Sequence, residues 1–297
     1  MKWRGRGGAG RIEDRRGAGG GLGGGRLPFP LPIGKTGGGI GTILIVLLLI
    51  FLQSRGGGGG FGVDPGTGAL PQAPGASAGD LGKAPPDDAG KFVDFVAGDV
   101  DATWTRLFAE SGQTYEPATI VLYDDAVSSA CGNTPSTVGP FYCPRDRKVY
   151  LDLPFMEQLQ RQLGAPGDFA QAYIIAHEIG HHVQNLLGVM DDVDLARQEN
   201  PDDANELSVR LELQADCLAG VWGHSAYAQP ELLETGDLEE GLNAAAAVGD
   251  DRIQRQAGQE VNPEAFTHGT AEQRVRWFRA GFDGGDATAC NTFEGDV

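Results

Sequence analysis

The stretch "QAYIIAHEIGHHVQNLLG", residues 171–188, decides how the chain is interpreted, because it places three of the five histidines within six positions. Its surroundings are apolar, and the segment predicts a helix with Asp168 as its N-cap and Gly188 as its C-terminal stop. Residues four apart project from the same face of a helix. We therefore expect His177 and His181 to reach one point in space.

"HEIGH" has the spacing H-E-x-x-H, which is the two-histidine clamp of zinc peptidases. Glu178 lies one step around the helix, so it can reach a water molecule bound to an ion held by His177 and His181. The alternative is a buried helix that carries imidazoles only for packing, but burying such groups without partners costs several kcal/mol. His182 points about 100° away from His181 and is not predicted to be a ligand.

A catalytic zinc site needs a third protein ligand and one open position for water. The extended histidine motif of metzincins is absent, because position 187 is leucine. The segment "NELSVRLELQADCLAGVWG", residues 205–223, instead carries Glu212 and Asp216 four apart within an apolar pattern. We expect Glu212 to be the third ligand and Asp216 to accept a hydrogen bond from a ligating histidine, which would fix its tautomer.

Several linked blocks resemble one bacterial family, the neutral zinc metallopeptidases. They are "AYIIAHEIGHHVQNLLG" (172–188), "RLELQADCLAGVWG" (210–223), "AAAAVGDDRIQ" (244–254) and "FTHGTAEQRVRWFRAGF" (266–282). The segment "RIEDRRG" (11–17) is similar to the opening of members of this family. The resemblance covers nearly the whole chain outside the linker described below. Four linked blocks make it far more specific than the five-residue motif alone.

The resemblance implies a gluzincin-type fold whose site is related to that of thermolysin. The matching metal ligands are His177, His181 and Glu212. Glu178 matches the catalytic base, and Asp216 matches the acid behind the ligands. The resemblance says little about the substrate.

Other polar residues are weaker candidates. The position of His268 in "FTHGT" resembles that of a polar residue that stabilises the oxyanion in some gluzincins, and a plain loop histidine is the alternative. Asp250 and Asp251 either organise the helices behind the site or form a solvated turn. His224 and Tyr227 receive no assignment.

The composition divides the chain into an N-terminal part without the material for a core and one long domain. Residues 1–39 are rich in glycine and arginine and are expected to be flexible. Residues 40–54 are expected to be an uncleaved transmembrane anchor, with the N-terminus in the cytoplasm and the catalytic domain outside it. A core helix and a cleaved signal peptide are the alternatives, but glycine tracts flank the run and no convincing cleavage site follows. Residues 55–91 are expected to be a disordered linker.

Residues 92–297 are expected to form one zincin-like α+β domain, mainly helical with a small β-sheet. The segments 118–124 and 148–153 are β-branched and aromatic, which predicts two strands. Besides the helix of the opening stretch, helical segments are predicted at 92–111, 205–227, 238–257 and 271–280. Two pairs of residues have the spacing of a capping box: Asp237 with Glu240, and Thr270 with Gln273.

All four cysteines follow the apolar run, and none belongs to a C-x-x-C pair, which weakens the case for a structural zinc site. An even number in a domain expected outside the cytoplasm predicts two disulfides. The sequence allows three pairings, of which Cys131–Cys143 and Cys217–Cys290 are favoured. Four reduced, buried thiols are the alternative.

The charge distribution excludes one class of partner. Residues 1–55 carry a net charge of +7, so the remainder carries −25 of the total of −18. A segment this acidic repels the phosphate backbone, and nucleic-acid binding is therefore not expected.

Together these patterns predict a membrane-anchored metalloendopeptidase with one catalytic Zn²⁺, acting on polypeptides outside the cytoplasm. A zinc-activated water would attack the peptide bond while Glu178 acts as general base. The strand at 148–153 is the expected edge for pairing with an extended substrate. The alternatives are a non-catalytic, zinc-stabilised binding domain and a disulfide-linked domain without metal. Neither alternative explains Glu178, because a structural zinc has no use for a carboxylate at its open position.

Overall fold

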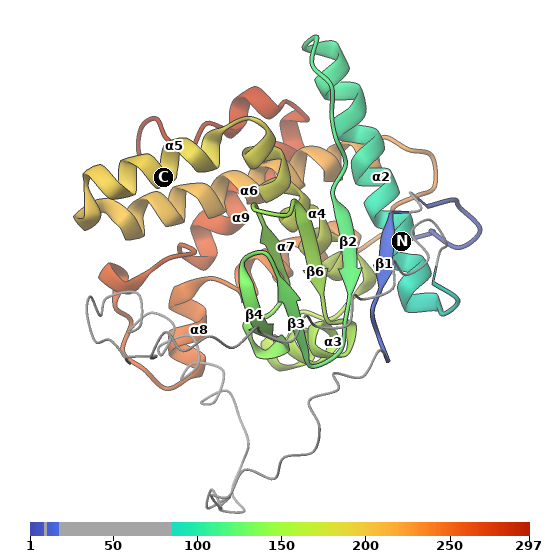
Figure 1. Ribbon diagram of the computed structural model, residues 1–297, viewed down its shortest axis with the longest axis horizontal. Coiled ribbons are helices and arrows are strands. Elements are labelled where there is room, and N and C mark those ends of the chain that lie inside the picture. Colours follow the sequence, from blue (N-terminus) through green and yellow to red (C-terminus); the bar gives the residue numbers. More distant parts are fainter. Residues whose placement is uncertain (9–10, 18–84) are drawn as a thin grey trace, which may run out of the picture.

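The computed structural model describes residues 1–8, 11–17 and 85–297. Its helices are α2 (Asp88–Glu110), α3 (Leu153–Leu163), α4 (Asp168–Leu186), α5 (Val189–Glu199), α6 (Ala204–Tyr227), α7 (Asp237–Ala247), α8 (Asp250–Gln256) and α9 (Ala271–Gly284). Its strands are β1 (Ile12–Asp14), β2 (Thr119–Leu122), β3 (Ala126–Ser129), β4 (Gly132–Pro135), β5 (Phe141–Cys143) and β6 (Lys148–Leu151). The fold is mainly helical with a small sheet, consistent with the predicted α+β class (Figure 1).

The main sheet has the strand order β1-β2-β6-β5, and β3 pairs with β4 in a separate two-stranded sheet. β2 runs parallel to both β1 and β6, whereas β5 runs antiparallel to β6. The strand predicted at 148–153 is thus β6, which has a partner on each side. The prediction that it is the free edge is wrong, because β5 lies between it and that border of the sheet.

The first residues of the chain belong to the folded domain, so the prediction that residues 1–39 are flexible is wrong for 1–8 and 11–17. Ile12 is paired with Ile120 and is 1 % exposed, and Met1 and Trp3 are buried in the main core. The prediction fails because a three-residue strand needs only one buried side chain and a partner, which composition does not reveal.

The position of β1 also bears on the predicted anchor. If the chain crossed the membrane once at residues 40–54, β1 and its partner β2 would lie on opposite sides of the membrane and could not pair. A cytoplasmic N-terminus is therefore not compatible with an extracytoplasmic domain in this fold. The predicted anchor, residues 40–54, lies outside the described residues. Among the residues that are described, no helix is long and apolar enough to span a membrane.

Glycines allow the helices that carry the site to approach at backbone distance. A Cβ atom on Gly220 of α6 would lie 2.0 Å from the carbonyl oxygen of Phe278 on α9, and one on Gly281 would lie 1.9 Å from that of Cys217. Gly180, inside the H-E-x-x-H motif, faces Ala215 of α6 in the same way, with a Cβ distance of 3.0 Å to the carbonyl oxygen. Side chains on α4, α6 and α9 can therefore meet in one buried layer.

Several helix ends differ from the sequence prediction. The segment predicted as one helix at 238–257 divides into α7 and α8 at Gly249, whose backbone is extended (φ −67°, ψ 135°). Glycine is required there because a Cβ atom would clash with the backbone of Ala271. The N-cap of α4 is Gly167 rather than Asp168. Asp237 forms no capping box, since it is already the first residue of α7 after Gly236.

Two other local predictions are confirmed. Thr270 and Gln273 form the predicted capping box of α9. The four cysteines form the favoured disulfides, Cys131–Cys143 and Cys217–Cys290. The second disulfide joins α6 to the segment that follows α9 and so holds the C-terminal end of the chain against the helix of Glu212.

Candidate metal centre and active site

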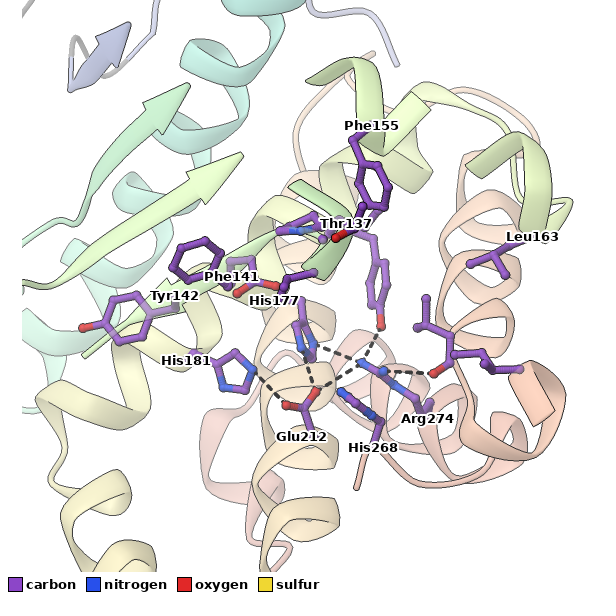
Figure 2. A pocket seen from close by; sticks show the side chains of 18 of the residues that line it. Thr137, Phe141, Tyr142, Phe155, Leu163, His177, His181, Glu212, His268 and Arg274 are labelled. Atoms are coloured by element: carbon purple, nitrogen blue, oxygen red, sulfur yellow. Dashed lines mark hydrogen bonds and ion pairs between the residues drawn. The ribbon is translucent and has the colours of Figure 1, made fainter. Parts of the chain in front are cut away.

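Three predicted ligands converge at one point, two from α4 and one from α6. His177 Nε2 lies 3.2 Å from one carboxylate oxygen of Glu212, and His181 Nε2 lies 3.4 Å from the other. Ligand atoms of all three side chains lie within 4.8 Å of one another. Figure 2 shows the two imidazoles and the carboxylate pointing toward one another.

The spacing and hydrogen bonding of these groups fit a tetrahedral zinc ion. Zinc bonds of about 2.0–2.1 Å at tetrahedral angles separate the ligand atoms by roughly 3.3–3.4 Å. Each imidazole is also held through its other nitrogen: His177 Nδ1 is 2.9 Å from Asp216 Oδ1, and His181 Nδ1 is 2.8 Å from Gln184 Oε1. Nδ1–H donation to these oxygens leaves both Nε2 atoms free to bind an ion.

Asp216 is fully buried behind His177 and accepts hydrogen bonds from three residues. The hydroxyl of Tyr173 and the Nδ1 atom of His177 both contact Oδ1. Arg274 of α9 donates to Oδ2 at 2.7 Å and to Oδ1 at 2.9 Å. This network fixes the ring of His177 through a hydrogen bond to Asp216, the contact that was expected of Asp216. Arg274 is a further partner of Asp216, which the sequence did not indicate.

The electrostatics favour a positive charge at the centre of the cluster. Burial opposes a charged imidazole, but hydrogen bonds to Asp216 and Glu212 and their negative charges raise the pKa of His177 to about 10. Burial also disfavours the ionised form of Glu212, yet the two histidines hold its pKa well below the usual value. A site that binds a proton this firmly also attracts a metal cation, and the two compete for Nε2.

Glu178 is buried beside the cluster at the wall of a cavity of about 420 Å³. Burial raises the pKa of Glu178 above its ordinary value, although the neighbouring imidazoles oppose this shift. Among the described residues no donor forms a hydrogen bond to its carboxylate, in contrast to Asp216. A carboxylate of raised pKa that is not already engaged is suited to accept a proton and release it again.

His268 lines the same cavity, and the loop that carries it is held by Asp250. Asp250 Oδ2 accepts hydrogen bonds from the backbone N–H groups of Thr267, His268 and Gly269, at 2.7, 2.7 and 3.1 Å. The other oxygen of Asp250 lies 3.2 Å from His268 Nδ1. Burial works against a charged ring, but Asp250 and the charge of Glu212 raise the pKa of His268. Asp250 is therefore not part of a solvated turn, and it orients His268.

The cavity is apolar on most of its surface outside the metal cluster. Phe155 and Leu163 of α3, Ile174 of α4 and Val248 and Ile253 near α8 contribute to its lining. The opposite wall is the edge strand β5 together with the segment that precedes it. In Figure 2 the aromatic rings of β5 and the side chains of α3 lie on different sides of His177.

The remaining histidines lie outside the cluster, as expected for His182. His182 is 1 % exposed, with Nδ1 3.0 Å from the hydroxyl of Tyr142 and Nε2 2.6 Å from the carbonyl oxygen of Glu116. It therefore ties α4 to β5 and to the segment before β2. His224 contacts the carbonyl oxygen of Phe282 through Nδ1, and Tyr227 is largely exposed.

Two members of the site, Tyr173 and Arg274, were not predicted from the sequence. Tyr173 precedes His177 by four positions and so lies on the same face of α4. Arg274 is followed at the same spacing by Phe278, which is fully buried. An arginine in line with an apolar helix face is a signal for a buried ion pair, and it could have led to Asp216.

Comparisons with known proteins agree with this site. The sequence model of a family described as "Putative neutral zinc metallopeptidase" matches residues 1–293, and the chain therefore belongs to that family. It is 46 % identical over 296 residues to "Uncharacterized protein YpfJ" of Escherichia coli K12, covering 99 % of each chain. It is 42 % identical over 255 residues to "Uncharacterized protein Rv2575" of Mycobacterium tuberculosis H37Rv, covering 78 % of this chain and 83 % of the relative. No solved structure matches significantly.

Proposed function

We propose that the protein is a zinc-dependent endopeptidase that hydrolyses extended polypeptides. The observation that carries this proposal is Glu178, a buried carboxylate at the cavity wall that has no hydrogen-bond donor in the described part of the chain, beside three correctly spaced ligands. A binding domain with a structural zinc would gain nothing from burying such a group, since an ionised carboxylate without partners is costly. Membership of a zinc metallopeptidase family supports the same reaction class.

The residues of the site divide the work of peptide hydrolysis. A zinc ion held by His177, His181 and Glu212 would supply Lewis acidity at the scissile carbonyl and lower the pKa of water. Glu178 accepts the proton of the attacking water and delivers it to the leaving amine. His268, oriented by Asp250, donates a hydrogen bond to the carbonyl oxygen as negative charge develops there.

The substrate would lie along β5 instead of β6. Among the described residues β5 forms the border of the main sheet, so no described strand pairs with its outward N–H and C=O groups. Phe141 and Tyr142 of β5 line the cavity. Pairing with backbone groups gives binding that depends little on side-chain sequence. We therefore expect an extended, unstructured chain to be the preferred type of substrate.

We also propose that the domain works outside the cytoplasm, attached to a membrane through the apolar run at residues 40–54. Two disulfides support an oxidising compartment. The β1–β2 pairing requires residues 1–17 and 85–297 to share one side of that membrane. Protease digestion of intact and permeabilised cells tests this: both flanks should become accessible together, and opposite accessibility would refute the shared side.

The reaction is tested with the full-length chain, zinc and an unstructured protein such as casein. Glu178→Gln should lower kcat by about 10³-fold or more while zinc content and the unfolding midpoint stay near wild type. Glu157→Gln, an exposed glutamate of α3 paired with Arg161, is the matched control and should remain active. Equal cleavage by wild type and Glu178→Gln, or a wild type without bound zinc, would contradict the proposal. A zinc-loaded wild type that cleaves nothing would favour a non-catalytic, zinc-stabilised binding domain.

A further inference from the structure

One disulfide closes a loop that forms a wall of the cavity. The Cys131–Cys143 loop, residues 131–143, contains β4, a short 3₁₀ turn at Ser136–Val138 and β5. Six cavity-lining residues come from this loop: Thr137, Val138, Gly139, Pro140, Phe141 and Tyr142. All six lie between the two cysteines, so the disulfide closes the loop that supplies this part of the cavity wall.

In the described part of the chain, the hydrogen bonds of residues 131–140 stay within the β3–β4 hairpin and its turns. Of residues 131–140, only Gly139 is buried, and glycine has no side chain with which to anchor the segment. β4 pairs only with β3, in a two-stranded sheet separate from the main one. A hydrogen bond from Ser136 N to Asp125 O joins the end of β4 to the residue before β3. Its partner strand β3 is fixed to the main sheet, because Val127 packs with Val121, Tyr123 and Tyr150. Arg15 also donates to the carbonyl oxygen of Ser128, and Ala130 N donates to Asp146 Oδ2. Residues 131–140 are joined to that sheet through β3, through the chain at β5 and through the disulfide.

The other end of the disulfide lies in the core. Cys143 is 0 % exposed and ends β5, where it packs with Val121, Tyr123 and Tyr150. Cys131 is exposed at the turn of the β3–β4 hairpin. The bond therefore connects a weakly packed wall to the strand along which the substrate is proposed to pair.

We propose that the Cys131–Cys143 disulfide is a substrate-positioning element, which holds the wall at Thr137–Pro140 in the conformation that accepts an extended peptide. This inference rests on the proposed peptidase function. Without the bond, binding must first order the wall, and the lost conformational entropy weakens the affinity for peptide. The ligands on α4 and α6 lie outside the loop, so we expect loss of the bond to change metal binding and the chemical step much less than peptide binding.

The test replaces both cysteines in the full-length chain, Cys131→Ser with Cys143→Ser. The expected result is a KM for casein raised about 10–100-fold, with kcat, zinc content and the cooperativity of unfolding close to wild type. An unchanged KM would overturn the proposal. A general loss of zinc and of folded protein would also overturn it, because the bond would then be a structural staple.

A second measurement separates this inference from the reaction itself. Zinc-loaded Glu178→Gln, with and without the two serine substitutions, is titrated with a fluorescent unstructured peptide. Binding should weaken about 10–100-fold on loss of the disulfide, whether or not the wild type turns the peptide over. Equal affinities, or no binding by Glu178→Gln, would refute the positioning role. A shift in affinity combined with an inactive wild type would refute only the proposed function.

Discussion

Two buried aspartates, Asp216 on α6 and Asp101 on α2, show how neighbours decide what a buried carboxylate does. Asp216 is fully buried and receives hydrogen bonds from His177, Tyr173 and Arg274. Burial acts to raise its pKa, but Arg274 and His177 outweigh burial and lower the pKa. Asp101 is 9 % exposed and receives one neutral hydrogen bond, from the hydroxyl of Tyr115 at 2.9 Å.

Burial dominates at Asp101 and raises its pKa to about 7. The region of Asp216 is thus built around a negative charge that orients His177, the predicted metal ligand. The region of Asp101 accommodates a buried carboxyl group without stabilising its charge. Burial alone does not identify a functional acid, whereas a buried acid with an arginine and a histidine as donors is a strong indicator of one.

Asp216→Asn should have the largest effect, because it removes the charge that compensates Arg274. We expect a loss of about 3–5 kcal/mol in the free energy of unfolding, as for other broken buried ion pairs. Zinc affinity should fall roughly 10–100-fold as His177 loses its orienting acceptor. Urea unfolding and zinc competition titrations measure the two effects. The double variant Asp216→Asn with Arg274→Met should recover part of the stability, and a neutral single variant would disprove the assigned pairing.

Asp250→Asn should have an intermediate effect. Asp250 is a charged acceptor for three backbone N–H groups and for His268, and hydrogen bonds to charged groups contribute about 1.5–3 kcal/mol. We expect a stability loss of this order and a lower kcat, with zinc content unchanged. The exposed Asp194→Asn on α5 is the control. Wild-type kcat in Asp250→Asn would show that the orientation of His268 is not important for the reaction.

Asp101→Asn should have the smallest effect, and it should raise the free energy of unfolding where the other two substitutions lower it. In the folded chain the carboxyl titrates near pH 7, above its pKa when unfolded, so the unfolded state binds fewer protons between about pH 4 and 7. Asp101 therefore lowers wild-type stability as the pH rises through this window.

The asparagine variant lacks this titration. It should be about 1–2 kcal/mol more stable than wild type at pH 8, after allowance for an amide N–H without a partner, and should show no gain at pH 4. Unfolding midpoints at the two pH values test the sign. A variant that is less stable at pH 8 would mean that the Asp101 charge is compensated and that the contrast with Asp216 does not hold.

The sequence was most informative where spacing on a helix sets the geometry. Each of two pairs has a spacing of four residues: His177 with His181, and Glu212 with Asp216. Each pair could therefore be assigned to one face of its own helix before the positions of the helices were known. The meeting of α4 with α6 depends on glycine contacts such as Gly180 against Ala215, which no periodicity reveals.

The sheet was harder to predict. β1, β4 and β5 have three or four residues each, and glycine or proline occurs in or next to β4 and β5, so their strand signal is weak. The edge was misassigned for this reason. Arg274 was missed because its partner, Asp216, lies on another helix and is distant in the sequence.

The position of β1 has a consequence for how the molecule is made. Ile12 leaves the ribosome long before Ile120, its partner, so the edges of β1 stay open until that part of the chain has emerged. An open strand border is a template for other chains. The β1 of one copy can therefore pair with the β2 of another copy and take the place of that copy's own β1. The same backbone hydrogen bonds that complete one molecule can then link two.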